Sequence, residues 1–553
     1  MKSTQVSGAL ELAKARTYVS GLDDVLNGGL PSGRTTCING MAGSGKTLLG
    51  LEFLYRGALN GEPGIFIGFE ESIRQICENA ATMGWDLEAL QRENRLFLMD
   101  SRLTPDILRS GDFSLKGLLA VVSGKQREMK ATRVVFDALE VALRLFDTSQ
   151  QVRNEMHVLN DWLHSAGMTS ILTLRQRANQ EASAYEEFFD SMADCLIRMT
   201  TRTVDQSAIS RLQVVKYRGS AFGRNEIPYI IGEGGIRLAP ISTVGLRHKR
   251  PGDRLSSGLS RLNKMLGGGY QRGSCILIAG LPGTGKTILA STFAAETSVR
   301  GESVIYIGFE ESETAVVGNV LSAGVNLSPH TESGLLRFLT GFPEAMGAEE
   351  HYFRALEGIQ AAGAKHVVVD AISACRRMGG EQAAYEYLMR LLNACKEKGI
   401  TIILINQTSS DGEFLGLSGN NISSMVDTML HLQYQQCPGE TNRVIQILKS
   451  RGSSHSNLKH EFAITGEGIR ILDAYIGEGD VLTGSLRGRQ EMKDQFAAQR
   501  LAYDIEFKEL ELKLMRLNQE GAKQARAQRS VNWNSLDAPV EANPDTSSGM
   551  QEE

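Results

Sequence analysis

The feature that most constrains this chain is an internal repeat, because a repeated segment of this kind implies a repeated folding unit. The segment GMAGSGKT at residues 40–47 returns 240 residues later as GLPGTGKT at 280–287. The segment IGFEES at 67–72 returns at the same offset, at 307–312. A glycine-rich loop followed by a paired-glutamate segment is therefore written twice in the same order.

Two later landmarks extend the repeat at a shorter offset of 233 residues. The run VVFD that ends at Asp137 returns as VVVD, and KYRG, which starts at Lys216, returns as KSRG. Four landmarks in one order, at nearly constant spacing, predict two homologous domains within the 553 residues. We place their boundaries at 1–240 and 241–480.

Within each copy, short runs rich in Val and Ile alternate with longer segments of helical periodicity. In the second copy the runs CILIAG, SVIYIGF, HVVVD and TIILINQ are apolar almost throughout. Such runs are typical of strands buried on both faces. The sequence therefore predicts an α/β fold in each domain, with a mostly parallel sheet lying between helices.

Composition narrows the classes of function. Lys and Arg total 59 against 64 Asp and Glu, which gives a net charge of −5, whereas duplex-DNA binders are usually basic. The sequence shows neither an apolar run long enough to span a membrane nor an N-terminal signal peptide. Seven cysteines without a CxxC pair indicate neither a disulfide framework nor a zinc site. We expect a cytoplasmic protein with reduced cysteines that binds neither membrane nor nucleic acid.

Both glycine-rich segments match the P-loop pattern G-x-x-x-x-G-K-[ST], whose backbone N–H groups surround phosphate oxygens. Lys46 and Lys286 are expected to neutralise the β- and γ-phosphates, and Thr47 and Thr287 to offer a hydroxyl to Mg²⁺. The sequence thus predicts two ATP sites with Mg²⁺ as the cofactor. Their predicted residues are Gly40, Gly43, Ser44, Gly45, Lys46 and Thr47, and Gly280, Gly283, Thr284, Gly285, Lys286 and Thr287.

Acidic residues at the ends of two strands complete each predicted site. Asp137 and Asp370 end apolar runs, which is the Walker B position, where a carboxylate holds the water shell of Mg²⁺. A pair of glutamates follows another strand of each copy, where a carboxylate beside the γ-phosphate can take a proton from water or a hydroxyl. The predicted catalytic residues are Glu70, Glu71, Glu310 and Glu311.

A lysine and an arginine, two residues apart, recur on a late strand of each copy: Lys216 with Arg218, and Lys449 with Arg451. Side chains two apart on a strand project from one face, so both can meet one phosphate. The pair makes most sense as a group that reaches the nucleotide of a neighbouring subunit. We therefore predict that all four residues bind phosphate in trans.

With these motifs assembled, residues 15–485 resemble the KaiC family, the tandem RecA-like ATPases and autokinases of circadian clocks. The resemblance rests on the doubled P-loops, the doubled FEES segments, the doubled K-x-R-G strands and LTGS at 482–485. It implies ATP bound between the subunits of a homohexameric double ring. It also implies an ATPase in the first domain and a serine/threonine autokinase, with autophosphatase activity, in the second.

The same resemblance singles out the residues that would be phosphorylated. The segment ISSMVDT at 422–428 is similar to the family's Ser-Thr phosphorylation segment, with Ser423 and Ser424 at the two hydroxyl positions. The first domain carries Asp190 and Ser191 there, so the double site belongs to the second domain alone. A phosphoserine adds about −1.5 to −2 charges, enough to alter a contact between subunits. We expect this pair to act as a timing or signalling switch.

The chain ends in a segment of different character. Residues 481–530 are predicted to form a helix, and 531–553 to be disordered. A short heptad seam, limited by Lys493 and Arg500 to about two heptads, predicts a coiled coil that joins two hexamers into a dodecamer. The alternative is a single amphipathic helix lying on its own ring. The tail argues against KaiA-like regulation and is compatible with a KaiB-like partner on the first-domain ring. The seam consists of Phe496, Tyr503, Phe507, Leu510, Leu514 and Leu517.

Two other hypotheses about the function rest on the same P-loop core. A RecA-type DNA-dependent ATPase, either a recombinase or a helicase, would need basic DNA-binding loops and a DNA-binding domain, and the sequence shows neither. A non-catalytic scaffold whose nucleotides only hold rings together has no need of glutamate pairs in both copies. The ATPase and autokinase reading accounts for more of the repeated residues than either alternative.

Overall fold

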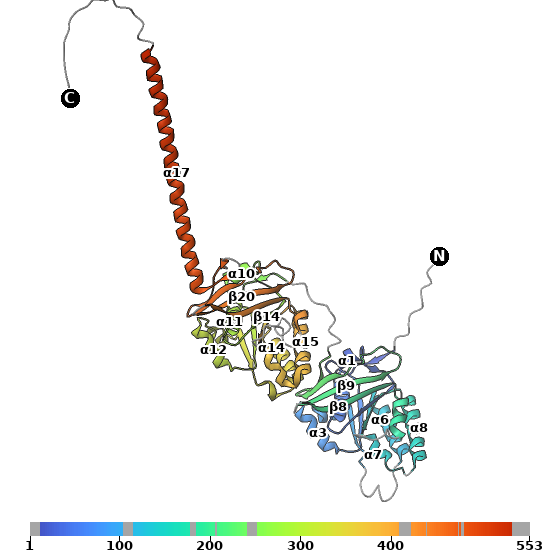
Figure 1. Ribbon diagram of the computed structural model, residues 1–553. Coiled ribbons are helices and arrows are strands. Elements are labelled where there is room, and N and C mark those ends of the chain that lie inside the picture. The colour runs from blue at the N-terminus through green and yellow to red at the C-terminus, as the bar shows by residue number, and fades with distance from the viewer. Residues whose placement is uncertain are drawn as a thin grey trace, which may run out of the picture. The chain divides into compact units, whose positions relative to one another are not determined.

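The computed structural model shows two domains of the same architecture, each with one nine-stranded sheet between helices (Figure 1). The predicted α/β fold, with two tandem RecA-like domains and a C-terminal helix, is confirmed. The strand order in space is identical in the two sheets when equivalent strands are matched. The structure describes residues 12–102, 114–146, 148–176, 184–204, 207–240, 252–408, 422–437, 440–473, 475–476 and 481–533.

The first sheet is parallel through its centre and antiparallel at one side. The parallel ladder joins β5, β4, β6, β7, β3 and β8, and β9, β10 and β11 continue it as antiparallel strands. In spatial order the strands are β5 (Leu96–Asp100), β4 (Gly64–Gly68), β6 (Arg133–Asp137), β7 (Thr169–Arg175), β3 (Thr35–Gly40), β8 (Cys195–Val204), β9 (Ser207–Tyr217), β10 (Ile227–Gly232) and β11 (Gly235–Leu238).

Alternate residues of the central strands enter two separate apolar cores, one on each face of this sheet, as strand geometry requires. One core gathers Ile38 and Phe66 with α1 (Leu22–Val25), α2 (Lys46–Leu59), α3 (Ile73–Thr82) and α4 (Leu87–Arg92). The other gathers Cys37 and Phe136 with α6 (Leu115–Met129), α7 (Leu139–Leu143), α8 (Ser149–Ala166) and α9 (Ala184–Met192).

The second sheet repeats the first strand for strand. Its parallel ladder also gives way to an antiparallel side, where β20, β21 and β22 follow one another. In spatial order the strands are β16 (Leu336–Thr340), β15 (Val304–Gly308), β17 (His366–Asp370), β18 (Thr401–Gln407), β14 (Cys275–Gly280), β19 (Thr428–Cys437), β20 (Glu440–Ser450), β21 (His460–Thr465) and β22 (Gly468–Ile471).

Helices cover both faces of the second sheet as well. Ile276 and Tyr306 share an apolar core with α10 (Ser260–Met265), α11 (Lys286–Val299) and α12 (Glu313–Ser322). The short helix α13 (Ser328–Glu332) contributes no buried residue. Leu277 and Val369 face α14 (Ala348–Ala361), α15 (Gly380–Lys398) and the 3₁₀ helix η2 (Ile372–Met378). The remaining short elements are β1 (Lys14–Ala15), β2 (Leu30–Pro31), β12 (Arg254–Leu255), β13 (Tyr270–Gln271), η1 (Pro343–Ala345), η3 (Ile422–Ser424), β23 (Tyr475–Ile476) and β24 (Val481–Leu482).

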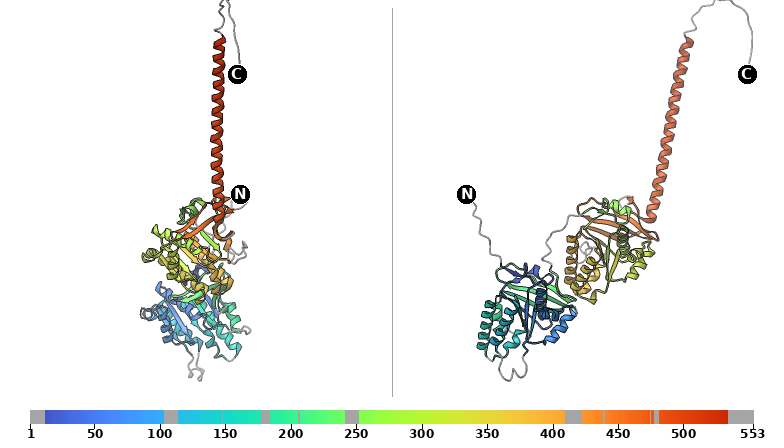
Figure 2. Two further views of the ribbon diagram at one scale, coloured as in Figure 1. Left: turned by 60° about the vertical axis from the view of Figure 1, so that its left-hand side comes forward. Right: turned by 180° about the vertical axis from the view of Figure 1, so that it is seen from behind.

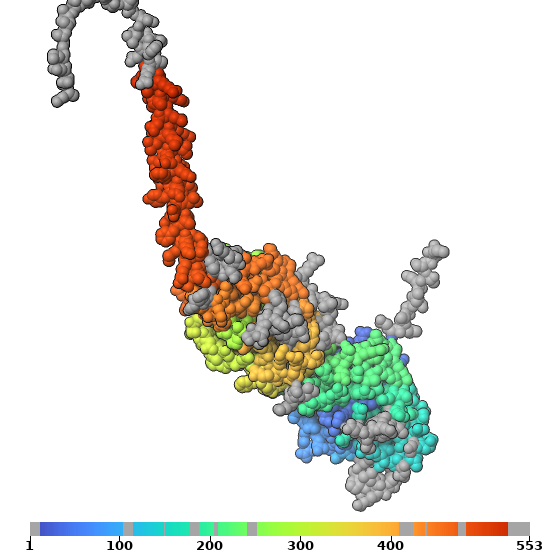
Figure 3. Space-filling model, in the orientation of Figure 1, coloured from blue at the N-terminus to red at the C-terminus, as the bar shows by residue number. Residues whose placement is uncertain are grey.

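The C-terminal helix α17 is unbroken from Gly484 to Trp533 (Figure 2). It belongs to a unit of its own with the end of β19, residues 435–437, and the start of β20, residues 440–442. Within that unit the backbone N–H of Ser485 donates to Glu440 at 2.5 Å. The side chains of residues 492–528 are exposed, and Figure 3 shows them along the surface of this red column. The predicted disordered tail, 531–553, lies outside the described residues from 534 onward.

Strand register brings the predicted site residues together. In the first sheet Gly68 pairs with Asp137, and Gly40 pairs with Arg175. In the second, Gly308 pairs with Asp370. The carboxyl ends of these parallel strands meet at one edge, which is where open α/β sheets bind ligands.

Candidate functional site

The P-loops join a buried strand to a long helix in both domains. The first loop runs from Gly40 at the end of β3 to Lys46 at the start of α2, and Gly45 has a φ of 83°. Gly285 takes the same role before α11, with a φ of 98°. Such left-handed conformations favour glycine, and they leave the helix N-terminus and its free N–H groups facing the loop. The predicted phosphate-binding glycines therefore lie where that role requires.

The P-loop lysines fold back over their own loops. The Nζ atoms of Lys46 and Lys286 donate to the carbonyls of Met41 and Leu281, both at 2.7 Å. Burial lowers the pKa of each lysine, while neighbouring carboxylates oppose that effect. The hydroxyl of Ser44 also donates to the Met41 carbonyl, at 2.8 Å, and Thr284 makes the equivalent bond in the second loop. The lysines are thus held at the loop that would enclose the phosphates.

The threonine that follows each lysine is joined to the Walker B aspartate. The Oγ1 atom of Thr47 lies 3.0 and 2.9 Å from the two carboxylate oxygens of Asp137. Thr287 donates to Asp370 at 2.8 Å. A hydroxyl and a carboxylate at this separation form the oxygen donor set that Mg²⁺ prefers. These four residues therefore fit the cation that the P-loop chemistry implies.

Asp137 is buried and Asp370 is partly buried, and burial raises the pKa of each above the ordinary value. Donated hydrogen bonds act in the opposite direction. Asp137 accepts from Thr173 as well as from Thr47, and Asp370 accepts from Tyr306 as well as from Thr287. Each carboxylate is consequently held by two hydroxyl donors.

The two members of each glutamate pair differ in their hydrogen bonds. Glu71 accepts from Nδ2 of Asn79 at 3.3 Å, and Glu311 from Nδ2 of Asn319 at 2.9 Å. Within the described residues no hydrogen bond is found for the carboxylate of Glu70 or of Glu310. Burial, followed by the charge of Asp370, raises the pKa of Glu310. The first glutamate of each pair is therefore the one free to accept a proton.

A cavity of about 390 Å³ joins these groups in the first domain. Its lining includes the P-loop, both glutamates of the pair and Asp137. It also includes three side chains that sequence reasoning did not select: Glu140, Thr173 and Arg175. In the second domain a smaller hollow of about 160 Å³ lies against Glu310 and Glu311.

The lysine–arginine pairs lie elsewhere. Lys216 is in β9 and Arg218 follows the strand end, and neither lines the first-domain cavity. Lys216 donates to the carbonyls of Asp190 and Ser191 at 2.7 and 3.0 Å, and Arg218 donates to that of Ser191 at 2.7 Å. The two side chains thus share one target, as expected of neighbours on one face.

In the second domain Lys449 is in β20 and Arg451 follows the strand end, so each matches its first-domain counterpart. The backbone N–H of Arg451 donates to the carbonyl of Asp427 at 2.9 Å. Arg218 donates in the same way to Asp194, at 2.8 Å. The repeat therefore extends to the backbone anchors of both pairs.

The predicted phosphorylation segment is only partly described. Ser423 and Ser424 lie in η3, and Ser424 is exposed, while the preceding residues 409–421 lie outside the described part. At the matching first-domain position Asp190 accepts from Nδ2 of Asn39 at 3.1 Å. An acidic side chain therefore occupies the place that a serine takes in the second domain.

Two further features bear on the classes of protein considered. The described residues contain no helix that is long and apolar enough to cross a bilayer. Six cysteines of the described residues are free thiols: Cys37, Cys77, Cys195, Cys275, Cys375 and Cys395.

A P-loop, a threonine–aspartate pair and a glutamate pair at the carboxyl edge of a parallel sheet define a nucleotide-binding ATPase domain, here present twice in tandem. A sequence model of the family described as "ATPase: KaiC" matches residues 15–243 and 255–475. The chain belongs to the KaiC family.

Curated relatives agree over nearly the whole chain. The "Circadian clock protein KaiC2" of Synechocystis sp. is 38% identical over 508 residues, which is 91% of this chain and 89% of the relative. The "Circadian clock oscillator protein KaiC" of Picosynechococcus sp. is 33% identical over 485 residues, covering 87% and 93%. That of Prochlorococcus marinus is 32% identical over 492 residues, covering 88% and 96%.

Proposed function

We propose that this KaiC-family ATPase is a serine/threonine autokinase, with autophosphatase activity. Its first domain hydrolyses ATP, and its second transfers phosphate to Ser423 and Ser424 as a timing or signalling switch. One observation carries the proposal. In both domains a threonine–aspartate pair lies at the same edge of the sheet, beside a P-loop, with a glutamate that has no hydrogen-bond partner among the described residues. This is the equipment of phosphoryl transfer, and only the second domain has a serine pair at 423–424.

In the second domain each residue has a defined task. Lys286 and the backbone N–H groups of the loop would hold the phosphates. Thr287 and Asp370 would hold Mg²⁺, which neutralises charge on the phosphates when bound. Glu310 takes the proton of the serine hydroxyl as its oxygen bonds to the γ-phosphorus, and ADP leaves with the electrons of the broken bond.

The test is intact mass and phosphosite mapping of the full chain after incubation with Mg-ATP. We expect phosphate on Ser423 or Ser424, and none in a Lys286→Ala variant. The matched Lys46→Ala variant should lose first-domain hydrolysis instead. Consumption of ATP with neither serine labelled would overturn the autokinase assignment and leave a double-domain ATPase.

A homohexameric ring is part of the same proposal. Lys216 and Arg218 do not line the cavity of their own domain, so a phosphate contact by this pair requires a neighbouring subunit's nucleotide. Lys449 and Arg451 would act alike in the second ring. Replacing Lys449 and Arg451 by Met should therefore abolish phosphorylation of the variant alone. Mixing it with the Lys286→Ala variant should restore some, because each subunit then supplies what its neighbour lacks.

We propose further that α17 joins two hexamers into a dodecamer. Its seam is exposed: Phe496 is 69% and Tyr503 78% accessible, and Leu510, Leu514 and Leu517 lie between 55 and 64%. Burying such side chains in a helix pair is favourable by roughly 1.5–3 kcal/mol each. A KaiB-like partner on the first-domain ring remains compatible with this arrangement.

Truncation after Arg487 should halve the particle mass measured by light scattering. A full-length variant carrying Leu510→Glu and Leu514→Glu should do the same, because buried charges at the seam disfavour the helix pair. Exchanging two exposed polar residues instead, with Gln519→Glu and Lys523→Glu, is the matched control. An unchanged mass in the first two variants would exclude the seam as the joint.

A further inference from the structure

The first-domain cavity contains a buried carboxylate that the proposed chemistry leaves unused. Glu140 is the second residue of α7, three residues after the Walker B Asp137. Its side chain is only 2% exposed, yet its Oε2 atom has no hydrogen-bond partner within the described residues. A buried carboxylate oxygen without a donor is strongly unfavourable. An oxygen in this condition on a cavity wall is a place for a ligand that donates a hydrogen bond.

The neighbours of Glu140 are the reactive groups of the site. Lys46, Glu70, Thr173 and Arg175 line the same cavity. Among the charges that raise the pKa of Lys46, that of Glu140 has the largest effect, ahead of that of Asp137. Burial raises the pKa of Glu140 itself, and the charge of Glu70 raises it further, whereas backbone amides and Lys46 lower it. The carboxylate therefore lines the cavity together with the P-loop lysine, the predicted base and the Walker B aspartate, the groups expected to surround the γ-phosphate.

The second domain lacks this group. The repeat offset places Ser373 at the equivalent position, and its Oγ atom is likewise buried without a partner in the described part of the chain. A serine hydroxyl is shorter than a glutamate side chain by two heavy-atom bonds and carries no charge. The charges that raise the pKa of Lys286 are accordingly those of Asp370 and Glu310. The two sites thus differ by one carboxylate at the end where a nucleophile would attack.

We propose that Glu140 binds the attacking water of the first-domain site and so makes that domain a hydrolase. This inference rests on the proposed division of labour between the domains. Glu140 accepts one hydrogen bond from the water through Oε2, and Glu70 accepts the other. The serine at 373 leaves the second site without this water anchor, so its γ-phosphate is available to a serine hydroxyl.

The step balances as ordinary hydrolysis. The water oxygen forms a bond to the γ-phosphorus, and the bond from that phosphorus to the β,γ-bridging oxygen breaks, with its electrons leaving on ADP. The water proton passes to Glu70, which returns it to solvent. The products are ADP and inorganic phosphate, and Glu140 is unchanged.

The test compares Glu140→Gln and Glu140→Ser in the full chain, each also in a Lys286→Ala background that silences the second site. Steady-state phosphate release and thermal unfolding are measured on the same preparations. We expect kcat to fall at least 10-fold with KM for ATP within about 2-fold, because an anchor for water is not a contact to ATP. The unfolding temperature should stay the same or rise, since a buried charge with one unpartnered oxygen, Oε2, has been removed. Glu128→Gln, on the exposed side of α6, is the matched control.

A purely structural role predicts a different outcome: kcat falls only in step with the unfolding temperature, or stays at the level of the unmodified chain. Either result would overturn the assignment. The reciprocal Ser373→Glu variant should raise phosphate release relative to labelling of Ser423 and Ser424, and an unchanged ratio would contradict the proposal. If the unmodified chain released no phosphate at all, the proposed function itself would fail, which is a distinct outcome.

Discussion

The two domains hold their Walker B aspartates with different partners. In the first, Thr173 donates to Asp137 at 2.7 Å, and the position that repeats as Tyr306 is Phe66. In the second, the Tyr306 hydroxyl donates to Asp370, also at 2.7 Å. The position equivalent to Thr173 is Asn406.

The exchange shows what the site needs. Each aspartate receives two hydroxyl donors, one from the P-loop threonine and one from a neighbouring strand. The strand that supplies the second donor differs, β7 in the first domain and β15 in the second. The number of hydroxyl donors on the Walker B carboxylate is therefore the same in both domains, while the residue that supplies the second donor differs. Such donors oppose the effect of burial on the pKa and so favour the charged form that cation binding requires.

The glutamate pairs give the sharpest way to test whether the two sites work alike. Glu310→Gln should reduce phosphorylation of the second domain by about 100-fold or more, because a general base contributes roughly 10²–10⁴-fold. Glu311→Gln should cost only a few-fold, since its carboxylate is already engaged by Asn319. Phosphate incorporation with radiolabelled ATP measures both variants.

Glu70→Gln and Glu71→Gln should show the same order for phosphate release by the first domain. ATP binding, followed by a fluorescent analogue, should survive in all four variants. Equal losses of phosphorylation in Glu310→Gln and Glu311→Gln would mean that both glutamates contribute equally. The hydrogen bond from Asn319 would then not distinguish Glu311 from Glu310.

The exchanged donors lead to a smaller effect. Tyr306→Phe removes one hydroxyl from Asp370, and Thr173→Val removes one from Asp137. A hydrogen bond to a charged group contributes about 1.5–3 kcal/mol. We therefore expect the Mg²⁺ concentration that gives half-maximal activity of the affected domain to rise roughly 10-fold or more. Titration of activity with Mg²⁺ provides the measurement.

Each variant serves as the control for the other, since Tyr306→Phe should leave first-domain hydrolysis alone and Thr173→Val should leave phosphorylation alone. A Mg²⁺ requirement that does not move in either variant would show that the second donor only fixes the side chain in place.

Much of this site was predictable from the sequence because its motifs recur in both domains. The P-loops, Asp137 and Asp370 lie at the ends of strands that their apolar runs had predicted, and they meet because parallel strands end at one edge. The C-terminal helix was also expected, with bounds of 481–530 against the observed Gly484–Trp533.

What escaped prediction lacks a repeated pattern or depends on packing. Glu140 has no acidic counterpart in the other copy, and the counterpart of Tyr306 is Phe66, which lacks the hydroxyl, so comparison of the repeats did not select them. Their roles follow only from burial and from which carboxylate each one faces. Asn79 and Asn319 could have been found, because they recur at the 240-residue offset. Their value became visible only when the helix placed each amide against a glutamate.

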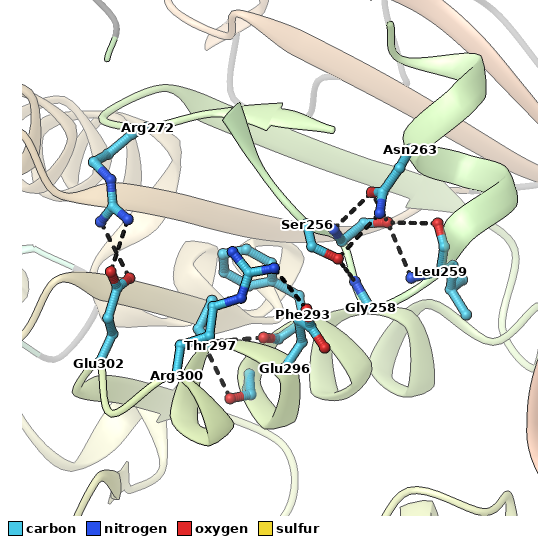
Figure 4. Close-up of polar contacts among 12 residues, drawn as sticks. Ser256, Gly258, Leu259, Asn263, Arg272, Phe293, Glu296, Thr297, Arg300 and Glu302 are labelled. Carbon is cyan, nitrogen blue, oxygen red and sulfur yellow. Dashed lines mark hydrogen bonds and ion pairs between the residues drawn. The ribbon is translucent and has the colours of Figure 1, made fainter. Parts of the chain in front are cut away.

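The opposite end of the central strands offers a second comparison. Strand β6 begins with Arg133, which is buried, pairs with Glu62 and lies over the Phe53 ring. At the equivalent place β17 begins with His366, whose Nε2 lies 2.5 Å from Glu302. Figure 4 shows the two terminal guanidinium nitrogens of Arg272 facing the two carboxylate oxygens of that Glu302. An arginine that stays charged has thus been replaced by a side chain that titrates.

The consequence is a pH dependence in the second domain that the equivalent position of the first domain, Arg133, does not share. Burial holds the pKa of His366 below its ordinary value, so the unfolded chain binds a proton near pH 6.5 that the folded domain does not. Stability should therefore fall as pH drops below about 6.5, by at most ~1.4 kcal/mol per pH unit.

Other groups can be separated from this effect. Hydrogen bonds from Arg272 lower the pKa of Glu302 to about 2, so its contribution is lost only as pH falls toward that value. His351, His431 and His460 also have lowered pKa values in this domain. The His366→Gln variant is needed to isolate one histidine among them.

Hydrogen exchange resolved by mass spectrometry, at pH values between 7 and 5.5 and corrected for the intrinsic exchange rate, checks the prediction strand by strand. Peptides from β17 should lose protection as the pH falls, and peptides from β6 should lose less, because Arg133 keeps its charge throughout this range. In the His366→Gln variant the loss of protection with falling pH should become more alike in the two strands. If β17 in that variant responds to pH as in the unmodified chain, His366 is not the titrating group, and the difference between the two sheet ends is one of packing alone.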